Sequence, residues 1–172
     1  MIETDRLIID RIKKEDKEDY FYNISHDKKV LETFICRYEE TLEGFDFESI
    51  YTKDSLFAIR LKDNKKLIGL ISLYKDEGNE IEIGYGIGSS YWNKGYVTEA
   101  VKPFIKYLFN TRDVNVIKAS YFKGNDASKR VMEKCGMKYS HITQDELAHL
   151  GDHRDLIYYK IDRNEYISTC NK

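Results

Sequence analysis

Two kinds of hydrophobic spacing alternate along this chain, and together they predict a mixed order of strands and helices. Alternating or continuously apolar runs predict strands at residues 6–12, 55–62, 65–75, 81–87, 114–121 and 156–161. Apolar positions three and four residues apart predict helices at 13–26, from about 96 to 109, and at 125–136. Residues 27–53 and 137–155 are only weakly periodic. We expect the strands between 55 and 87 to form an antiparallel meander, and 114–121 to pair in parallel with 81–87 across the helix between them.

The stretch from residue 82 to 109 is the centre of this pattern. Its alternating strand ends in a turn of small and aromatic residues, GSSYWNKGY, which runs directly into an amphipathic helix. Pro103 lies inside that helix, but the apolar stripe continues across it, so the pattern predicts one kinked helix rather than two. The apolar positions are Val97, Ala100, Val101, Phe104, Ile105, Leu108 and Phe109.

A strand followed by a glycine-containing turn and a helix start is suited to holding an anion. The first backbone N–H groups of a helix have no partner within the helix, and the aligned peptide dipoles favour negative charge there. Gly95 has no Cβ and would let a phosphate approach the backbone closely. This segment therefore predicts a phosphate-bearing ligand.

Composition narrows the classes of protein that fit. The chain has 172 residues, a formal net charge of -2 and 41% hydrophobic residues, which predicts one α/β domain spanning residues 1–172. A near-neutral charge argues against nucleic-acid binding, and no apolar run is long enough to cross a membrane. The first residues lack an apolar signal core, so we expect a cytoplasmic location. The three cysteines fit neither a disulfide framework nor a zinc cluster, and no motif indicates a metal.

An acidic stretch leaves two interpretations open. Five carboxylates surround a single Arg37 in this weakly periodic region, and they form either a solvated helix face or a rim that attracts a cationic substrate. The solvated face is the favoured interpretation. The carboxylates are Glu39, Glu40, Glu43, Asp46 and Glu48.

Three segments together resemble the GNAT superfamily of N-acetyltransferases, in particular the branch of ribosomal-protein N-terminal acetyltransferases (RimJ/RimL type). The segments are TDRLIIDRI, EIGYGIGSSYWNKGYVTEAV and NDASKRVMEKCGM, and they occur in the family's order and spacing over essentially the whole chain. The resemblance implies a mixed α/β (α+β) fold with a mostly antiparallel central sheet, splayed parallel strands and flanking helices. It also implies acetyl-CoA as the acetyl donor.

By the same resemblance, the turn at the helix start binds the pyrophosphate of acetyl-CoA through its backbone N–H groups, with Lys94 as a counter-charge. Val97 stands where the family has Gly or Ala, and its branched side chain could crowd the phosphate. The residues assigned to this cradle are Trp92, Asn93, Lys94, Gly95, Tyr96, Val97 and Thr98.

Gly84 and Gly86 interrupt the preceding strand, which predicts a bulge or a close backbone approach. The resemblance implies that this strand splays from the parallel one, and that backbone groups of Tyr85 and Ile87 pair with the pantetheine arm. A strand N–H near the bulge would then stabilise the thioester oxygen as negative charge develops. The alternative is that each glycine only accommodates strand twist.

Acetyl transfer to an amine requires a base for the amine and a proton for the departing sulfur. Many family members use a helix tyrosine for the second task, but Met132 stands at that position, so Ser128 is the candidate. Asn125 would bind the pantetheine arm or a bridging water, cap the helix, or do both.

Glu82 is the preferred base by its position on the strand, with Glu80 as the fallback, and an exposed glutamate without a role is the alternative. Three histidines, His141, His149 and His153, rank below Glu82 because nothing in the sequence brings them near the thioester.

The sequence therefore predicts an acetyl-CoA-dependent N-acetyltransferase that acts on a primary amine by direct attack in a ternary complex. A cationic acceptor, such as a protein N-terminus, a polyamine or another small cationic amine, is favoured by the acidic residues of the 39–48 stretch and by Asp145, Glu146, Asp152 and Asp155. The alternative is an acetyl-CoA-binding module with weak or no catalysis. Exposed strand edges and the 14 tyrosines allow a homodimer.

Overall fold

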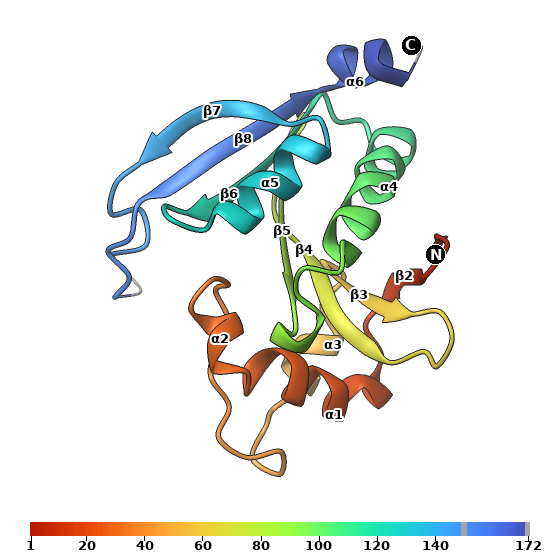
Figure 1. Ribbon diagram of the computed structural model, residues 1–172, viewed down its shortest axis with the longest axis vertical. Coiled ribbons are helices and arrows are strands. Elements are labelled where there is room, and N and C mark those ends of the chain that lie inside the picture. The colour runs from red at the N-terminus through yellow and green to blue at the C-terminus, as the bar shows by residue number, and fades with distance from the viewer. Residues whose placement is uncertain (149–150, 171–172) are drawn as a thin grey trace. The chain divides into compact units, whose positions relative to one another are not determined.

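The computed structural model describes residues 1–148 and 151–170 (Figure 1). Its strands form one sheet in the order β1-β2-β3-β4-β5-β6-β8-β7. β5 and β6 pair in parallel, whereas the pairs β1–β2, β2–β3, β3–β4, β6–β8 and β7–β8 are antiparallel. The predicted mixed, mostly antiparallel sheet is confirmed. The strands are β1 (Ile2–Glu3), β2 (Leu7–Arg11), β3 (Leu56–Leu61), β4 (Leu67–Glu77), β5 (Glu80–Ile87), β6 (Val116–Phe122), β7 (Lys138–Thr143) and β8 (Leu156–Asp162).

Helices of very different lengths accompany the sheet (Figure 1). The longest, α4 (Tyr96–Thr111), is the helix expected after the central turn, and it runs without interruption across Pro103. The others are η1 (Lys14–Asp16), α1 (Lys17–Tyr20), η2 (Phe21–Ser25), α2 (Lys28–Leu31), α3 (Glu48–Tyr51), η3 (Ser89–Tyr91), α5 (Asp126–Lys134) and α6 (Arg163–Cys170).

The chain divides into two compact units. Unit 1 comprises Met1–Leu73 and Tyr85–Phe104, and unit 2 comprises Tyr74–Gly84 and Ile105–Lys172. The prediction of a single domain over residues 1–172 stays a prediction.

The single helix predicted at 13–26 is instead three consecutive helical segments in unit 1. A 3₁₀ turn (η1) leads into one α-turn (α1), and a π-turn (η2) closes the segment with a bond from His26 N to Phe21 O at 2.9 Å. The wider last turn leaves Phe21 and Ile24 buried in one aromatic core together with Tyr20. Tertiary packing therefore decides the local geometry of this segment, although its helical character follows from the sequence.

The weakly periodic region 27–53 supplies part of the same core. Phe45 and Phe47 are both 3% exposed, and both rings pack against Tyr20. The carboxylates between and around them are mostly exposed: Glu40, Glu43, Asp46 and Glu48 point to solvent, and Glu39 is half-buried beside Arg37. The exposure of these four carboxylates agrees with the solvated interpretation, although only Glu48 lies in a helix.

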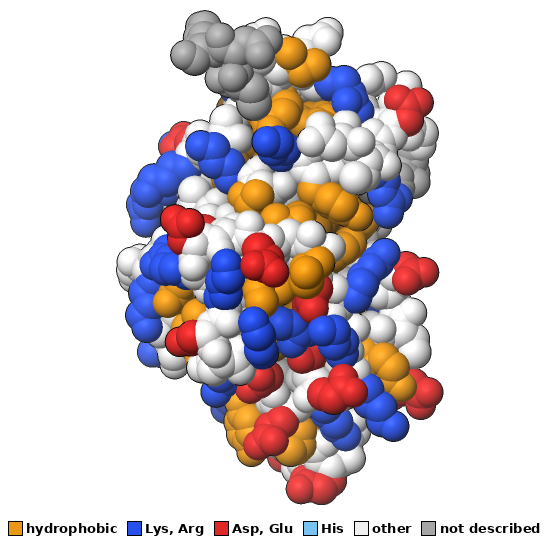
Figure 2. Space-filling view, turned by 90° about the vertical axis from the view of Figure 1, so that its right-hand side faces the viewer, with side chains coloured by type: hydrophobic (Ala, Val, Ile, Leu, Met, Phe, Trp, Pro, Cys, Tyr) orange, Lys and Arg blue, Asp and Glu red, His pale blue; other side chains and the backbone are white. Residues whose placement is uncertain are grey.

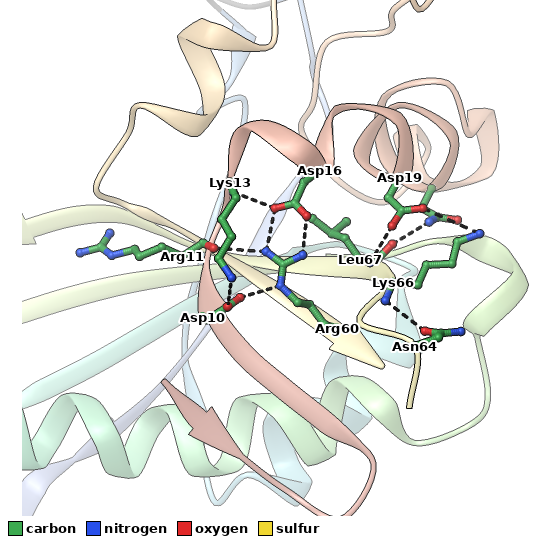
Figure 3. Close-up of polar contacts among 10 residues, drawn as sticks. Asp10, Arg11, Lys13, Asp16, Asp19, Arg60, Asn64, Lys66 and Leu67 are labelled. Carbon is green, nitrogen blue, oxygen red and sulfur yellow. Dashed lines mark hydrogen bonds and ion pairs between the residues drawn. The ribbon is translucent and has the colours of Figure 1, made fainter. Parts of the chain in front are cut away.

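A buried ion network joins β3 to the first helical turn of unit 1 (Figure 3). Arg60 donates from Nε to Asp10 at 2.7 Å and from Nη2 to Asp16 at 2.7 Å, with a further bond from Nη1 to Asp16. Asp16 also accepts the backbone N–H of Lys13 at 2.7 Å, and Arg60 donates to the carbonyl of Arg11 at 3.2 Å. Because Arg60 and Asp16 are each 5% exposed, each charge depends on the other for compensation.

Unit 2 is built on β6, β8 and β7, with α5 covering one face. Tyr159 donates to Glu133 of α5 at 3.4 Å, and its ring packs against Tyr121, so the α5 face contains Tyr121 and Tyr159. Because side chains alternate along a strand, Ser120 and Tyr158 point to the opposite face. The register pairs Ser120 directly with Tyr158.

Two elements of unit 2, β7 and α6, were not predicted from the sequence. All positions of β7 are exposed or half-buried, so its side chains show no alternation in hydrophobicity. α6 begins at Arg163, whose guanidinium donates to the carbonyls of Phe109, Arg112 and Val114 at 2.7, 3.0 and 2.8 Å. Long-range contacts rather than an amphipathic pattern define both elements.

Candidate functional site

The turn between β5 and α4 has the backbone geometry of an anion-binding loop. Asn93 and Gly95 both have positive φ, 61° and 78°, immediately before α4 begins at Tyr96. Successive N–H groups in left-handed and right-handed conformations form a concave, positively polarised surface. The backbone bond from Glu99 N to Gly95 O, at 3.1 Å, is the first bond of the helix. The N–H groups of Tyr96, Val97 and Thr98 therefore lie before the first N–H that takes part in this pattern.

Side chains and backbone groups of unit 1 fix the start of this turn. Gly88 N donates to Ile68 O at 2.9 Å, and Ser89 N donates to the carboxylate of Asp27 at 2.8 Å. Trp92 reaches back with its indole N–H to Ile87 O at 2.9 Å. The turn is therefore held by β4, β5 and the cap of α2, which leaves its backbone preorganised.

The first turn of α4 is anchored by Glu99 to the connection between β1 and β2. This carboxylate accepts from Thr4 Oγ1 at 2.6 Å, from Arg6 N at 2.9 Å and from Arg6 Nε at 2.7 Å, and the Arg6 guanidinium lies over the ring of Tyr96. Burial raises the pKa of Glu99, but the bonds from Thr4 and Arg6 outweigh it, so the pKa lies below its ordinary value. Glu99 therefore stays ionised at neutral pH and holds the start of α4 against the segment that leads into β2.

The cradle residues fit a phosphate-bearing ligand. A Cβ built on Gly95 would have Arg6 Nη2 as its nearest neighbour at 3.6 Å, so the glycine is required by its positive φ rather than by a clash within the protein. Gly95 and Asn93 are exposed, and Val97 is half-buried. Lys94 is exposed, with Nζ bonded to Ser90 O at 3.0 Å, and its charge lies beside the turn. These residues could hold a pyrophosphate mainly through backbone N–H groups.

Gly86 of β5 serves close packing in unit 1. A Cβ on Gly86 would lie 3.0 Å from the Phe34 ring, and one on Gly69 of β4 would lie 2.6 Å from Gly86 O.

The parallel register of β5 with β6 runs from Glu80↔Val116 to Ile83↔Ala119, and the strands continue to Ile87 and Phe122. Tyr85 and Ile87 belong to this later part of β5.

In unit 2, Asn125 and Ser128 lie together at the start of α5. Asn125 caps the helix, because its Oδ1 accepts Ser128 N at 3.2 Å, and its Nδ2 donates to Ser128 Oγ at 3.1 Å. Accepting that bond does not use the hydroxyl proton of Ser128. Asn125 therefore caps α5 and orients the Ser128 hydroxyl.

The two candidate bases on β5 differ in their surroundings. Glu80 forms an ion pair with Lys118 and its side chain is 51% exposed. Glu82 is half-buried and accepts a hydrogen bond from Ser120 Oγ at 3.3 Å. The ammonium group of Lys118 stabilises the ionised form of Glu80 and so lowers the affinity of that carboxylate for a proton.

Ser120, Thr143 and Tyr158, which the sequence reasoning missed, extend this group together with Glu146, one of the acids expected to attract a cationic acceptor. Tyr158 of β8 is 6% exposed and donates to Glu146 Oε2 at 2.7 Å, and Thr143 donates to the same oxygen at 2.7 Å. Ser120 and Tyr158 are register partners on the face opposite α5. Ser120 shares β6 with Lys118 and Tyr121, so it carries no distinct signal in the sequence, and only strand pairing shows its partners.

The described histidines have other surroundings. The ring of His141 stacks on Tyr158 with centroids 4.6 Å apart, and exposed His153 lies 3.2 Å from Asp145. His149 lies outside the described residues. Asp152 pairs with Arg154, and Asp155 with Lys123, so these acids of the C-terminal region already have cationic partners.

Within residues 1–148 and 151–170, no three His, Cys, Asp or Glu side chains are grouped as metal ligands would be. None of the helices in that part of the chain is both long and apolar enough to span a membrane. On the face drawn in Figure 2, basic and acidic side chains are interspersed, without a large basic patch.

Comparison with known proteins identifies the family. Residues 6–138 match the acetyltransferase (GNAT) domain. The chain is 27% identical over 175 residues to the uncharacterized N-acetyltransferase YoaA of Bacillus subtilis, covering 94% of this chain and 96% of that protein. It is also 27% identical over 96 residues to the [ribosomal protein uS5]-alanine N-acetyltransferase of Escherichia coli, covering 54% of this chain and 50% of that one.

The fold comparison agrees. A GNAT-family acetyltransferase from Bacillus anthracis superposes with a TM-score of 0.82 at 30% identity, covering 94% of this chain and 97% of that structure. The resemblance noted in the three sequence segments is thereby confirmed. The chain belongs to the GNAT family and is an N-acetyltransferase.

Proposed function

We propose that the chain transfers the acetyl group of acetyl-CoA to a primary amine by direct attack in a ternary complex. The observation that supports this most is the turn before α4, in which left-handed Asn93 and Gly95 precede the first N–H groups of a 16-residue helix. A fixed array of N–H groups suits a pyrophosphate, and the family uses acetyl-CoA. Bound acetyl-CoA supplies an activated acetyl thioester.

Backbone N–H groups bind the donor's phosphates in this proposal. Residues from Trp92 to Thr98 form the cradle, and Lys94 adds a positive charge near the turn. Tyr85 and Ile87 hold the pantetheine arm through their backbone groups. The branched side chain of Val97 is tolerated because contacts are made by the main chain.

Proton transfers are assigned to residues of unit 2. Glu82 accepts the proton of the attacking amine, since Glu80 is engaged by Lys118. The Ser128 hydroxyl gives a proton to the departing sulfur, and Asn125 orients that hydroxyl through the 3.1 Å bond to Oγ. A positioned acid or base of this kind contributes about 10²- to 10⁴-fold in rate.

The acceptor is proposed to be a cationic primary amine. A relative of this chain is a [ribosomal protein uS5]-alanine N-acetyltransferase, which favours a protein N-terminus, and a polyamine or another small cationic amine is the further option. The ion pairs of Asp152 and Asp155 reduce the contribution of those two acids to cation attraction.

The test is acetyl-CoA-dependent thiol release with a panel of amines: short peptides with free N-termini, spermidine and small monoamines. Release above background with at least one amine, reduced strongly in Glu82→Gln and little in Glu80→Gln, supports the proposal. Thermal stabilisation by acetyl-CoA without release on any amine would instead favour a catalytically inactive acetyl-CoA-binding module.

A further inference from the structure

A line of hydrogen-bonding side chains crosses unit 2 from β5 to the connection between β7 and β8. Ser120 Oγ donates to Glu82 Oε1 at 3.3 Å, and Ser120 is the register partner of Tyr158 on the same face. Tyr158 Oη then donates to Glu146 Oε2 at 2.7 Å. The Ser120 hydroxyl is a hydrogen-bonding neighbour of Tyr158 through this register, so two hydroxyl groups lie between the two carboxylates.

Burial makes this line more than a surface contact. Tyr158 is 6% exposed and packs with Phe122 and Leu156 beneath Leu147. Glu82, Ser120 and Glu146 are half-buried. Hydrogen bonds in a region of low polarity are electrostatically stronger and polarise one another, so a change at one end is felt along the line.

We propose that Ser120 and Tyr158 relay the amine proton from Glu82 to Glu146, so that Glu82 is restored as a base. The inference rests on the proposed role of Glu82. Glu82, protonated by the amine, gives its proton to Ser120 Oγ, and Ser120 gives its own to Tyr158 Oη. Tyr158 gives its proton to Glu146, so each hydroxyl gains one proton and loses one. Glu82 ends ionised and Glu146 ends protonated.

The surroundings of Tyr158 suit a relay rather than a base. Burial raises the pKa of Tyr158, and the bond to Glu146 and the charge of Glu82 raise it further, whereas the Ser120 hydroxyl opposes them. Tyr158 therefore keeps a proton at neutral pH and passes one on only when it receives another. On β7, His141 stacks on its ring.

Lysines at neighbouring positions of this face form ion pairs, including Lys138 of β7 with Glu165 of α6. Lys118 of β6 binds Glu80 of β5, and Lys160 of β8 lies 3.4 Å from Asp162. Lys118 is also the register partner of Glu82, so its ammonium group lies on the same face as the start of the relay.

Tyr158→Phe and Ser120→Ala break the line at successive points, and Tyr159→Phe is the matched control. Tyr159 is also 6% exposed and is the next residue of β8, but it bonds to Glu133 on the α5 face. With an accepted amine, we expect each relay variant to lower kcat by about tenfold or more with little change in KM, and the control to leave kcat unchanged. In the Glu82→Gln background, Tyr158→Phe should cost nothing further.

A wild-type kcat in Tyr158→Phe, or a full additional loss in the double variant, would overturn the relay. A second measurement separates this outcome from failure of the proposed function. The ¹³C-labelled carboxyl groups of Glu82 and Glu146, assigned with the Gln variants, can be titrated by NMR even if no amine is acetylated. The relay predicts that both Tyr158→Phe and Ser120→Ala shift the Glu82 titration and that Tyr159→Phe does not. An unshifted Glu82 titration in the two relay variants overturns the connection.

Discussion

Gly95→Ala is the substitution that tests the cradle most sharply. Gly95 has a φ of +78°, which an alanine adopts only with strain, and its nearest neighbour for a new Cβ lies 3.6 Å away. No clash arises within the protein. The cost is therefore conformational, about 1–2 kcal/mol for a left-handed alanine.

Gly78→Ala provides the matched control. Gly78 also has a positive φ, 61°, with nothing within 4 Å of a built Cβ, and it lies in the turn between β4 and β5. Both variants should lose about 1–2 kcal/mol of unfolding free energy, which corresponds to a melting temperature about 2–8 °C lower for a chain of this size. Equal losses would show that the two backbones pay a similar conformational cost.

Affinity for acetyl-CoA should separate the two variants. A methyl group at Gly95 either meets the phosphate or turns the peptide, and losing one hydrogen bond to a charged group costs about 1.5–3 kcal/mol. The Kd for acetyl-CoA, measured by isothermal titration calorimetry, should rise about 10- to 150-fold in Gly95→Ala and stay at the wild-type value in Gly78→Ala. A wild-type Kd in Gly95→Ala would refute the cradle.

Further predictions concern stability and proton transfer. Arg60→Met removes the ion-pair partner of the buried Asp16 carboxylate and should cost about 3–5 kcal/mol, a fall of about 6–20 °C in melting temperature. Burial raises the pKa of Asp10, but the bonds from Lys13 and Arg60 outweigh it and lower the pKa below 3.8. Its stabilisation is therefore present above pH 3.8 and lost as the pH falls through the folded pKa, and Asp10→Asn should flatten that part of an acid-unfolding curve. Glu82→Gln should lower kcat about 10²- to 10⁴-fold and abolish the fall of kcat at acidic pH. The kcat of Glu80→Gln should stay within a few-fold of the wild-type value. Ser128→Ala keeps the cap bond, which uses a backbone N–H, and loses only the bond from Asn125 to the hydroxyl among the bonds given above, so it should lower kcat with a change of only a few degrees in the melting temperature.

The elements with one buried side were predictable from the sequence. α4 shows its buried positions every three or four residues, and six of the seven apolar residues predicted for its inner face are buried, with Val97 half-buried. β3 and β4 likewise follow apolar runs. β7 has no such pattern because it is exposed or half-buried along its length and pairs with β8 alone among the described register pairs.

The site was predictable where its chemistry is local in sequence. The turn with Gly95 combines a strand end, a glycine and a helix start within a few residues, and the Asn125 cap lies three residues before Ser128. Tyr158 and Glu146 could not be placed, because they reach the neighbourhood of Glu82 only through the register of β6 and β8. Non-local pairing of this kind leaves no periodic signal in a single sequence.

Transfer of a labelled acetyl group tests the central claim most directly. Acetyl-CoA carrying ¹³C at the acetyl carbonyl, mixed with the chain and an amine from the panel, can be followed by NMR. We predict that the thioester resonance declines while an amide resonance of the acetylated amine grows at the same rate, and that the Glu82→Gln variant slows both. A thioester resonance that persists with every amine, or that is replaced only by free acetate, would contradict acetyl transfer to an amine.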